Sequence, residues 1–144
     1  MMEIVMGDYK TDKSMIINKL MDFGDESGYS STSPLNQTKN ISLRIQNDGA
    51  TTVGLISGTI EMGILRIDGF VIEKEVRGTG FGSKLISKLE ELAIKENCKI
   101  SLVDTVSFSA PKFYEKKGYT LLGEIKDYPF ENESYYTYMK RLAK

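Results

Sequence analysis

The sequence contains no histidine and only one cysteine, and these two shortages exclude several kinds of chemistry. Without histidine, Ser-His and Cys-His nucleophile pairs cannot form, and most transition-metal sites lose their usual ligand. Because Cys98 stands alone, neither an internal disulfide nor a cysteine-based zinc site can be built. We therefore expect no metal site. Nucleophilic catalysis by Cys98 is also disfavoured, since no histidine could activate it.

The sequence also lacks an excess of charge of one sign and any long apolar run. Its 19 basic and 20 acidic residues leave a formal net charge of −1, which argues against a protein that binds nucleic acid through a basic face. No apolar stretch approaches the roughly 18 residues of a membrane span. The opening segment MMEIVMGDYK has acidic residues and no apolar core of signal-peptide length. We expect a cytoplasmic protein that binds neither nucleic acid nor membranes, with a single domain over residues 1–144.

The N-terminal part of the chain predicts a strand, a helix and a long loop. A short apolar run at residues 2–6 has strand character, and either Asp12 or Ser14 would cap the helix that follows. The apolar face of that helix would consist of Ile16, Ile17, Leu20 and Phe23. The polar stretch 24–39 is predicted to be a loop, which is either a lid or binding loop or a disordered segment.

Residues 41–72 predict three strands joined by tight turns. The apolar residues Ile41, Leu43 and Ile45 alternate with polar ones, and Asn47-Asp48-Gly49 is a strong turn signal. A second turn at 61–63 leads into ILRIDGFVI, a nearly continuous apolar run that predicts a central strand. Gly69 within this run predicts a bulge or a close approach of another backbone.

The second half of the chain continues the alternation of helices and strands. Helices are predicted at 80–97 and 110–117, the second ended by Gly118, and strands at 100–104, 119–126 and 135–141. The complete order is β-α-β-β-β-α-β-α-β-β. This order predicts an α/β fold in which a mixed sheet is flanked by helices.

The most informative stretch is Arg77-Gly78-Thr79-Gly80-Phe81-Gly82-Ser83, between a buried strand and a strongly amphipathic helix. Glycines at alternate positions let backbone amides converge, and the helix N-terminus adds partial positive charge, so the stretch predicts a phosphate or pyrophosphate site. In nucleoside-triphosphate loops the last glycine is followed by Lys-Ser/Thr, whereas Gly82 is followed by Ser83-Lys84. The spacing of Gly78, Gly80 and Gly82 also differs from the G-x-G-x-x-G of dinucleotide-binding loops. The alternative is a glycine-rich turn that simply starts a helix.

Together with its surroundings, this stretch resembles motif A of the GNAT superfamily of N-acetyltransferases. In that motif a strand ending L-x-V leads into Q/R-x-x-G-x-G/A and then a helix. The corresponding residues here are Phe70-Val71-Ile72 and then Arg77, Gly80 and Gly82. The order of elements fits the superfamily over nearly the whole chain, which implies a mostly antiparallel sheet.

A second resemblance lies downstream, where SFSAPKFYEKKGY is similar to motif B of the superfamily, N-x-x-A-x-x-F-Y-x-x-x-G-F. The matching residues are Ala110, Phe113, Tyr114, Gly118 and Tyr119. Ser107 occupies the usual asparagine position. The segment from Asp104 to Tyr128-Pro129 also looks like a subgroup of small prokaryotic-type members with D-T-x-S-F-x-A-P-x-F-Y followed by D-Y-P.

The resemblance implies an enzyme that uses acetyl-CoA as acyl donor and moves the acetyl group directly to a primary amine. Backbone groups of the central strand would pair with the pantetheine arm like an added strand, and amides of the glycine-rich stretch would hold the pyrophosphate. The implied donor-binding residues are Phe70, Val71, Ile72, Arg77, Gly78, Thr79, Gly80, Phe81, Gly82, Ser83, Ser107, Phe113 and Tyr114.

Tyr114 is the implied general acid, which would protonate the departing thiolate. The base is less defined, because several relatives carry a glutamate on the central strand where this chain has Arg66. Asp68 and Glu73 are the alternatives, each acting through a water molecule, although either is equally explained as a salt-bridging carboxylate. No dedicated base is needed if the amine arrives already neutral.

The acceptor is expected between the first helix, the 24–39 loop and the last hairpin. That hairpin combines tyrosines with carboxylates, namely Tyr128, Tyr135, Tyr136 and Tyr138 with Asp127, Glu131 and Glu133. Such a combination suits a cationic amine, so the expected partner is a small-molecule amine. The alternatives are a peptide or protein N-acetyltransferase and a non-catalytic acyl-CoA-binding regulatory domain. A homodimer is suggested only by analogy with relatives, which are often dimers.

Overall fold

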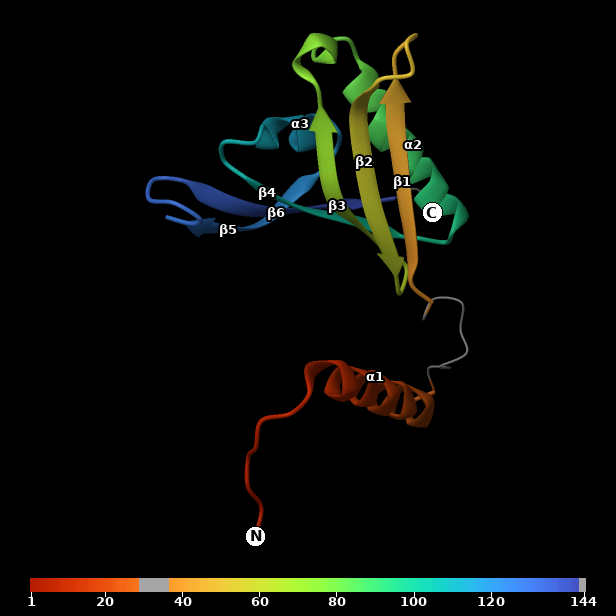
Figure 1. Ribbon diagram of the computed structural model, residues 1–144, viewed down its shortest axis with the longest axis vertical. Coiled ribbons are helices and arrows are strands. Elements are labelled where there is room, and N and C mark those ends of the chain that lie inside the picture. The colour runs from red at the N-terminus through yellow and green to blue at the C-terminus, as the bar shows by residue number, and fades with distance from the viewer. Residues whose placement is uncertain (29–36, 143–144) are drawn as a thin grey trace. The chain divides into compact units, whose positions relative to one another are not determined.

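The computed structural model describes residues 1–28 and 37–142. The chain forms two compact units, Met1–Asn36 and Gln37–Lys144. The elements in chain order are α1 (Tyr9–Glu26), β1 (Lys39–Gln46), β2 (Thr52–Glu61), β3 (Ile64–Ile72), η2 (Lys74–Val76), α2 (Phe81–Lys95), β4 (Ile100–Val106), α3 (Pro111–Lys116), β5 (Thr120–Lys126) and β6 (Ser134–Arg141) (Figure 1). That residues 1–144 act as one domain stays a prediction.

The N-terminal unit differs from the sequence prediction at both ends of its helix. Residues 2–6 form no strand, because a short apolar run needs a partner strand and none in the described part of the chain pairs with it. The helix α1 is capped by Asp8, whose Oδ2 accepts hydrogen bonds from Thr11 N at 3.0 Å and Thr11 Oγ1 at 2.7 Å. The predicted caps Asp12 and Ser14 are therefore wrong. The predicted 24–39 loop begins later than expected, since α1 continues to Glu26. Residues 29–36 of that predicted loop lie outside the described residues.

The second unit contains a six-stranded sheet in the order β1-β2-β3-β4-β6-β5. All neighbouring strands are antiparallel except β3 and β4, which are parallel. The predicted mixed, mostly antiparallel sheet is thus confirmed. The first hairpin turns where Asn47 was expected to start it, and Asn47 Oδ1 accepts hydrogen bonds from the backbone amides of Gly49 and Thr51, both at 3.0 Å.

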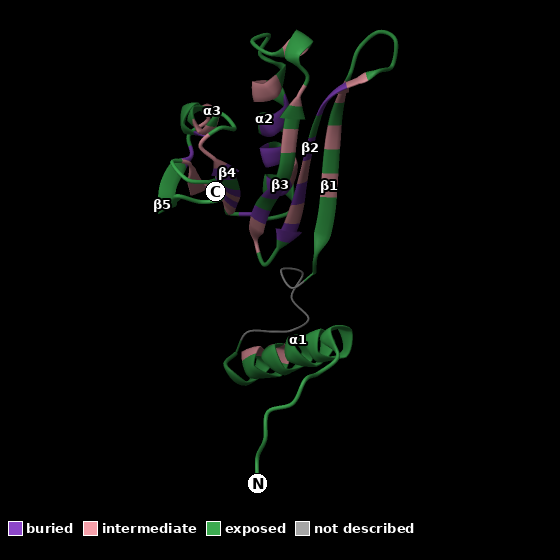
Figure 2. Ribbon diagram, turned by 60° about the vertical axis from the view of Figure 1, so that its left-hand side comes forward, coloured by how far each residue is buried: buried purple, intermediate pink, exposed green. Residues whose placement is uncertain are grey.

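The core of this unit lies between the sheet and α2. Alternate residues of β2, including Ile56 and Ile60, are buried, and so is the apolar stripe of α2 (Figure 2). The buried apolar residues of α2 are Leu85, Ile86, Leu89 and Ala93. These four residues form the buried face of the amphipathic helix predicted at 80–97, whereas Leu92 on the same helix is only half-buried.

Two irregularities in β3 shape the region where a site can form. The register passes from Ser57 opposite Gly69 to Gly58 opposite Ile67, so Asp68 is an extra residue and β3 is bulged beside Gly69, as predicted. In addition, β3 pairs with β4 only along Ile64–Ile67 and Ile100–Val103. Both strands continue beyond this pairing, to Ile72 and Val106, and the sheet therefore opens between their C-terminal ends (Figure 1).

Candidate active site

Two cavities lie at the opening between β3 and β4. The first, which we call the strand cavity, has a volume of about 460 Å³ and is lined mainly by β3 and β4. The second, the loop cavity, has a volume of about 610 Å³ and is lined by the end of β3, the glycine-rich stretch and the start of α3. Phe70, Ser109 and Tyr114 line both cavities, so the two spaces meet at these residues.

The glycine-rich stretch at the loop cavity has backbone conformations that favour glycine. Gly78 and Gly80 have φ values of 78° and 88°, in the left-handed region. Gly80 is also the N-cap of α2, and no side chain caps this helix end. The first backbone N–H groups of α2 therefore have no side-chain acceptor and are available to an anion, which the helix dipole also favours.

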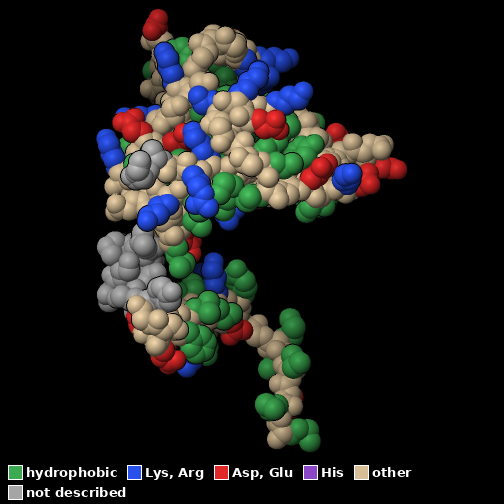
Figure 3. Space-filling model, turned by 180° about the vertical axis from the view of Figure 1, so that it is seen from behind, with side chains coloured by type: hydrophobic (Ala, Val, Ile, Leu, Met, Phe, Trp, Pro, Cys, Tyr) green, Lys and Arg blue, Asp and Glu red, His purple; other side chains and the backbone are tan. Residues whose placement is uncertain are grey.

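Two side chains of this stretch hold its shape. Arg77 Nε donates a hydrogen bond to the Ile72 carbonyl at 2.9 Å, and the Thr79 hydroxyl donates to the Val76 carbonyl. Figure 3 shows basic side chains gathered at the end of the unit where β3 ends and α2 begins. The loop cavity thus combines free amides with positive charge, which suits a phosphate group.

The edge of β3 that faces β4 is the second feature of the loop cavity. Beyond Ile67 this edge has no strand partner among the described residues, although β3 continues to Ile72. An extended chain with amide groups could hydrogen-bond to such an edge as an added strand would. Phe70, on the same segment, packs edge-to-face against Phe113 with ring centroids 5.4 Å apart. The residues present therefore fit a ligand that joins a pyrophosphate to an amide-bearing arm.

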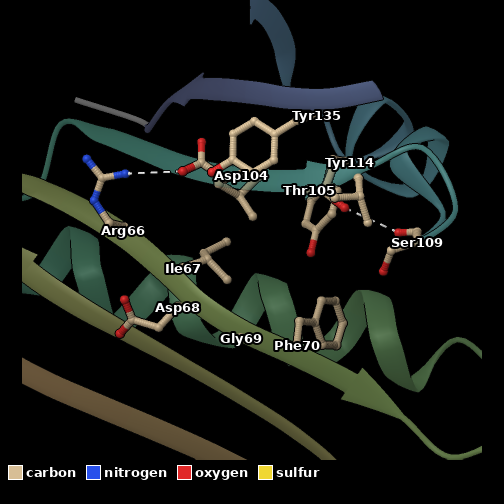
Figure 4. Close-up of a pocket in the computed structure, with 12 residues that line it drawn as sticks. Arg66, Ile67, Asp68, Gly69, Phe70, Asp104, Thr105, Ser109, Tyr114 and Tyr135 are labelled. Atoms are coloured by element: carbon tan, nitrogen blue, oxygen red, sulfur yellow. Dashed lines mark hydrogen bonds and ion pairs between the residues drawn. The ribbon is translucent and has the colours of Figure 1, made fainter. Parts of the chain in front are cut away.

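Tyr114 lies at the junction of the cavities and is largely enclosed. Its side chain projects from α3 into the space between β3 and β4, and the residue is 8% exposed (Figure 4). Burial raises the pKa of Tyr114 above its ordinary value, so the phenol is protonated at neutral pH. Within the described chain its hydroxyl makes no hydrogen bond, which leaves the proton available to a ligand.

The two predicted base candidates lie in different places. Asp68 lines the strand cavity, but its side chain lies toward β2, where the Thr59 hydroxyl donates a hydrogen bond to Oδ2 at 2.7 Å (Figure 4). Glu73 follows the end of β3 and lines neither cavity. Placement therefore favours Asp68 over Glu73 as the carboxylate nearest an acceptor.

Most of the predicted donor-binding residues surround the loop cavity. Those that line it are Phe70, Val71, Ile72, Arg77, Gly78, Gly80, Gly82, Ser83, Phe113 and Tyr114. Thr79, Phe81 and Ser107 line neither cavity. Ser107 is occupied elsewhere, since its hydroxyl donates to Glu133 Oε1 at 3.1 Å and accepts from Ser134 N at 2.9 Å.

The strand cavity carries an ion pair on its wall. Arg66 and Asp104 approach to 3.9 Å between guanidinium and carboxylate (Figure 4). Thr137 Oγ1 donates to Asp104 Oδ1 at 2.8 Å. Tyr135 also lines this cavity, and its interaction with the Asp104 carboxylate raises the pKa of the Tyr135 phenol. Cationic and anionic groups are both within reach of a ligand there.

Of the four tyrosines predicted to surround the acceptor, only Tyr135 lines a cavity. The side chains of β6 alternate between the faces of the sheet, so Tyr136 and Tyr138 point away from the face that Tyr135 occupies. Tyr138 is 2% exposed and belongs to the hydrophobic core. Tyr128 packs against Tyr135 at 5.6 Å between ring centroids but lines neither cavity.

Sequence reasoning missed Ser109 as a lining residue. Its backbone N–H donates to the Val106 carbonyl at 2.9 Å in the turn after β4, and this turn brings it to the junction of the cavities. The only signal was its position within the motif B segment, because its side chain matches no motif residue.

Residues 1–28 and 37–142 have neither a membrane-spanning helix nor a cluster of metal-binding side chains. No helix there is both long and apolar enough to cross a membrane. These residues also hold no group of three or more cysteine, aspartate or glutamate side chains placed to bind a metal ion.

Comparison with curated proteins finds acetyltransferases. The chain is 39% identical over 82 residues to the blasticidin-S acetyltransferase of Streptomyces morookaense, a match that covers 56% of this chain and 60% of the relative. It is 29% identical over 87 residues to an acetyltransferase of Agrobacterium fabrum, with 60% of this chain and 64% of the relative covered. The chain thus spans less than two thirds of the length of either relative.

Comparison with solved structures finds the same fold. An acetyltransferase from Bacillus cereus ATCC 14579 matches with a TM-score of 0.79 and 28% identity, covering 97% of this chain and 98% of that one. A candidate streptothricin acetyltransferase from Bacillus anthracis, solved in complex with acetyl coenzyme A, matches with a TM-score of 0.65. At 20% identity, over 75% of this chain and 65% of that one, this second match concerns the fold alone.

A family model agrees with both comparisons. The model of the acetyltransferase (GNAT) family matches residues 15–119, which is more than half of the chain. The match includes the bulged strand β3, the glycine-rich stretch and α3 with Tyr114. The chain therefore belongs to the acetyltransferase (GNAT) family.

Proposed function

We propose that this protein transfers the acetyl group of acetyl-CoA to the primary amine of a small molecule. The proposal is based on one observation: the two cavities share Phe70, Ser109 and Tyr114 as lining residues. A donor in the loop cavity and an acceptor in the strand cavity would react beside the Tyr114 hydroxyl. The small-molecule acceptor is supported by the blasticidin-S acetyltransferase relative, and acetyl-CoA by the fold neighbour solved with it.

The loop cavity would hold the donor at two places. Backbone N–H groups at the start of α2 would bind the pyrophosphate, helped by the charge of Arg77. The free edge of β3 from Gly69 to Val71 would align the amide-bearing arm. A backbone N–H on this edge could also stabilise negative charge on the thioester oxygen as the amine attacks.

Tyr114 would act on the sulfur that leaves. The reference pKa is about 10 for a phenol and about 8.5 for a thiol, so transfer of the proton to a fully formed thiolate is unfavourable by about 2 kcal/mol. We therefore assign the hydroxyl to hydrogen-bond donation while charge develops on sulfur. The proton that the amine loses on forming the amide balances the proton that the thiol gains.

The strand cavity would hold the acceptor. Its wall has Asp68, Asp104 and Tyr135, which suit an amine, and Arg66 where several relatives have a glutamate. Since Arg66 cannot act as a base, Asp68 is the remaining carboxylate on β3 that reaches this cavity, acting through a water molecule.

The test is release of free CoA thiol from acetyl-CoA in the presence of a broad panel of amines. We expect amine-dependent release, and for Tyr114→Phe we expect kcat to fall about 100-fold while the affinity for acetyl-CoA stays within a few-fold. Tyr128→Phe is the matched control, because it removes a phenol hydroxyl that lines neither cavity. A Tyr114→Phe enzyme with unchanged kcat would contradict the assigned role.

The same experiment separates the alternatives. If acetyl-CoA raises the melting temperature but no small amine triggers thiol release, peptides should be incubated with acetyl-CoA and analysed by mass spectrometry. Acetylated peptides would replace the small-molecule acceptor with a peptide one. An absence of both would leave an acyl-CoA-binding domain without turnover.

A further inference from the structure

The Tyr114 ring is held by other rings and not by a hydrogen bond of its own. Phe113 and Tyr119 contact it edge-to-face, with centroids 5.5 Å and 5.7 Å away, and Tyr138 stacks on it at 6.3 Å. Because the hydroxyl has no hydrogen-bond partner in the described chain, its direction depends on the packing of the ring, to which these three ring contacts contribute. Whatever fixes the neighbouring rings also fixes the Tyr114 hydroxyl.

Tyr119 is anchored by two hydrogen-bond partners of its hydroxyl. It is 4% exposed, and its hydroxyl donates to Glu90 Oε2 at 2.9 Å and lies 2.7 Å from the Ser101 hydroxyl. Its backbone N–H also donates to the Tyr114 carbonyl at 2.9 Å. Tyr119 is thus tied to α2 and β4 through its side chain and to α3 through its backbone.

Glu90 is a buried glutamate, and glutamate side chains are seldom buried unless they are paired. It lies on α2, is only 7% exposed, and receives a hydrogen bond from Lys140 Nζ at 2.8 Å on its second oxygen. A buried carboxylate is retained only with partners, and here both oxygens have one. The charged acceptor makes the bond from Tyr119 stronger than a neutral one would be.

We propose that Glu90 and Tyr119 are positioning residues for the acetyl transfer. The carboxylate of Glu90 fixes the Tyr119 ring, and that ring holds the Tyr114 hydroxyl at the junction of the two cavities. Neither Glu90 nor Tyr119 lines either cavity, so neither is expected to touch a ligand. The inference rests on the role of Tyr114 in the proposed function.

A double-mutant cycle tests the inference. Tyr119→Phe keeps the ring and removes its anchor, so we expect kcat to fall between about threefold and tenfold, with the affinity for acetyl-CoA unchanged, since misplacement of a reacting group lowers the rate. In a Tyr114→Phe background the same substitution should lower kcat no further, because there is no hydroxyl left to position. A merely structural role would lower kcat by the same factor in both backgrounds, and that result would overturn the inference.

Three further variants guard against loss of fold. Glu90→Gln keeps an oxygen acceptor for Tyr119 and should retain most of the activity, whereas Glu90→Ala should behave like Tyr119→Phe. Ile60→Val, in the core on β2, is the control for lowered stability and should leave kcat unchanged. Equal activity of Glu90→Ala and the wild type would also overturn the inference.

Failure of this inference is distinguishable from failure of the proposed function. If Tyr114→Phe lowers kcat but Tyr119→Phe does not, only the positioning role is wrong. If Tyr114→Phe retains full kcat, Tyr114 has no catalytic role and the positioning inference falls with it.

Discussion

At the scale of single residues, the backbone requires glycine at two positions of the glycine-rich stretch and not at a third. Gly78 and Gly80 have left-handed backbones, and a Cβ added to either would meet no atom within 4 Å. Backbone conformation, and not space, therefore requires glycine at these positions. Gly82 is helical, and its added Cβ would lie 3.6 Å from Phe70 Cζ, an ordinary contact distance.

Alanine substitutions should therefore have opposite effects at two of these glycines. Gly80→Ala places a side chain in the left-handed region, so we expect the unfolding free energy to fall by about 1–2 kcal/mol and acetyl-CoA binding to weaken. Gly82→Ala should be neutral or raise stability by up to about 1 kcal/mol, since alanine is the better helix former. Thermal denaturation and calorimetric titration with acetyl-CoA measure both effects. Equal destabilisation by the two substitutions would contradict the argument.

The two candidate bases are separated by where they lie. Asp68 lines the strand cavity and Glu73 does not, so we expect Asp68→Asn to lower kcat about tenfold or more. Glu73→Gln should leave kcat within twofold of the wild type and is the matched control. Steady-state kinetics with one acceptor amine measure both. If neither substitution changes kcat, the amine reacts without a dedicated base.

At the scale of elements, the turn between β1 and β2 shows how a correct sequence signal can differ in detail. The stretch Asn47-Asp48-Gly49 does turn the chain, but the residue with positive φ is Ala50, at 60°, and not Gly49. The reason is that Asn47 accepts hydrogen bonds from both Gly49 and Thr51, which lengthens the turn beyond two residues. The glycine thus lies one residue before the strained position.

Exchanging these two residues should stabilise the protein. In Gly49→Ala/Ala50→Gly, glycine takes the left-handed conformation, and the new Cβ at position 49 meets only Asn47 Oδ1 at 3.5 Å. We expect the unfolding free energy to rise by about 1 kcal/mol, measured by urea denaturation. The single variant Gly49→Ala keeps the strain and should gain less. Acetyl transfer should not change, because the turn contributes no residue to either cavity.

The bulge in β3 is the element that sequence reasoning located best. Gly69 marked it, and the extra residue is its neighbour Asp68. What the sequence could not indicate is the direction of the Asp68 side chain, because that depends on Thr59 across the sheet. A local signal thus predicted the irregularity but not its chemical consequence.

At the scale of the whole molecule, buried tyrosines dominate the response to pH. Burial is the main cause that raises the pKa of Tyr138, to about 12, with the Glu115 carboxylate adding to it. The pKa values of Tyr114 and Tyr119 are raised as well, again chiefly by burial. No histidine titrates near neutrality because the sequence has none.

The free energy of unfolding should therefore change little between about pH 6 and 9 and decrease above about pH 10. A phenol whose pKa is higher in the folded state contributes stability that is complete below its unfolded pKa of about 10 and is lost as the pH rises through the folded value. For Tyr138 this loss amounts to about 2 kcal/mol between pH 10 and 12. Urea denaturation across this range measures it. In Tyr138→Phe the alkaline decrease should be smaller, and an unchanged decrease would assign it to other groups.

The sequence by itself determined the features that depend on a few neighbouring residues. Periodicity predicted the stripe of α2 and the strands of the sheet, and the glycines before α2 predicted its anion-binding start, because face and φ preference are properties of short segments. The first strand was mispredicted because an apolar run without a partner cannot form a sheet. The predicted caps Asp12 and Ser14 were wrong because the helix begins earlier, where Asp8 caps it through Thr11. Only the tertiary structure decided where β3 stops pairing with β4. It also placed Tyr114 of α3 and Phe70 of β3 around the same two cavities. It also decided that Glu90, Tyr119 and Lys140 join in one buried network. These groups come from segments far apart in the chain, and their contacts follow from packing, which no local pattern encodes.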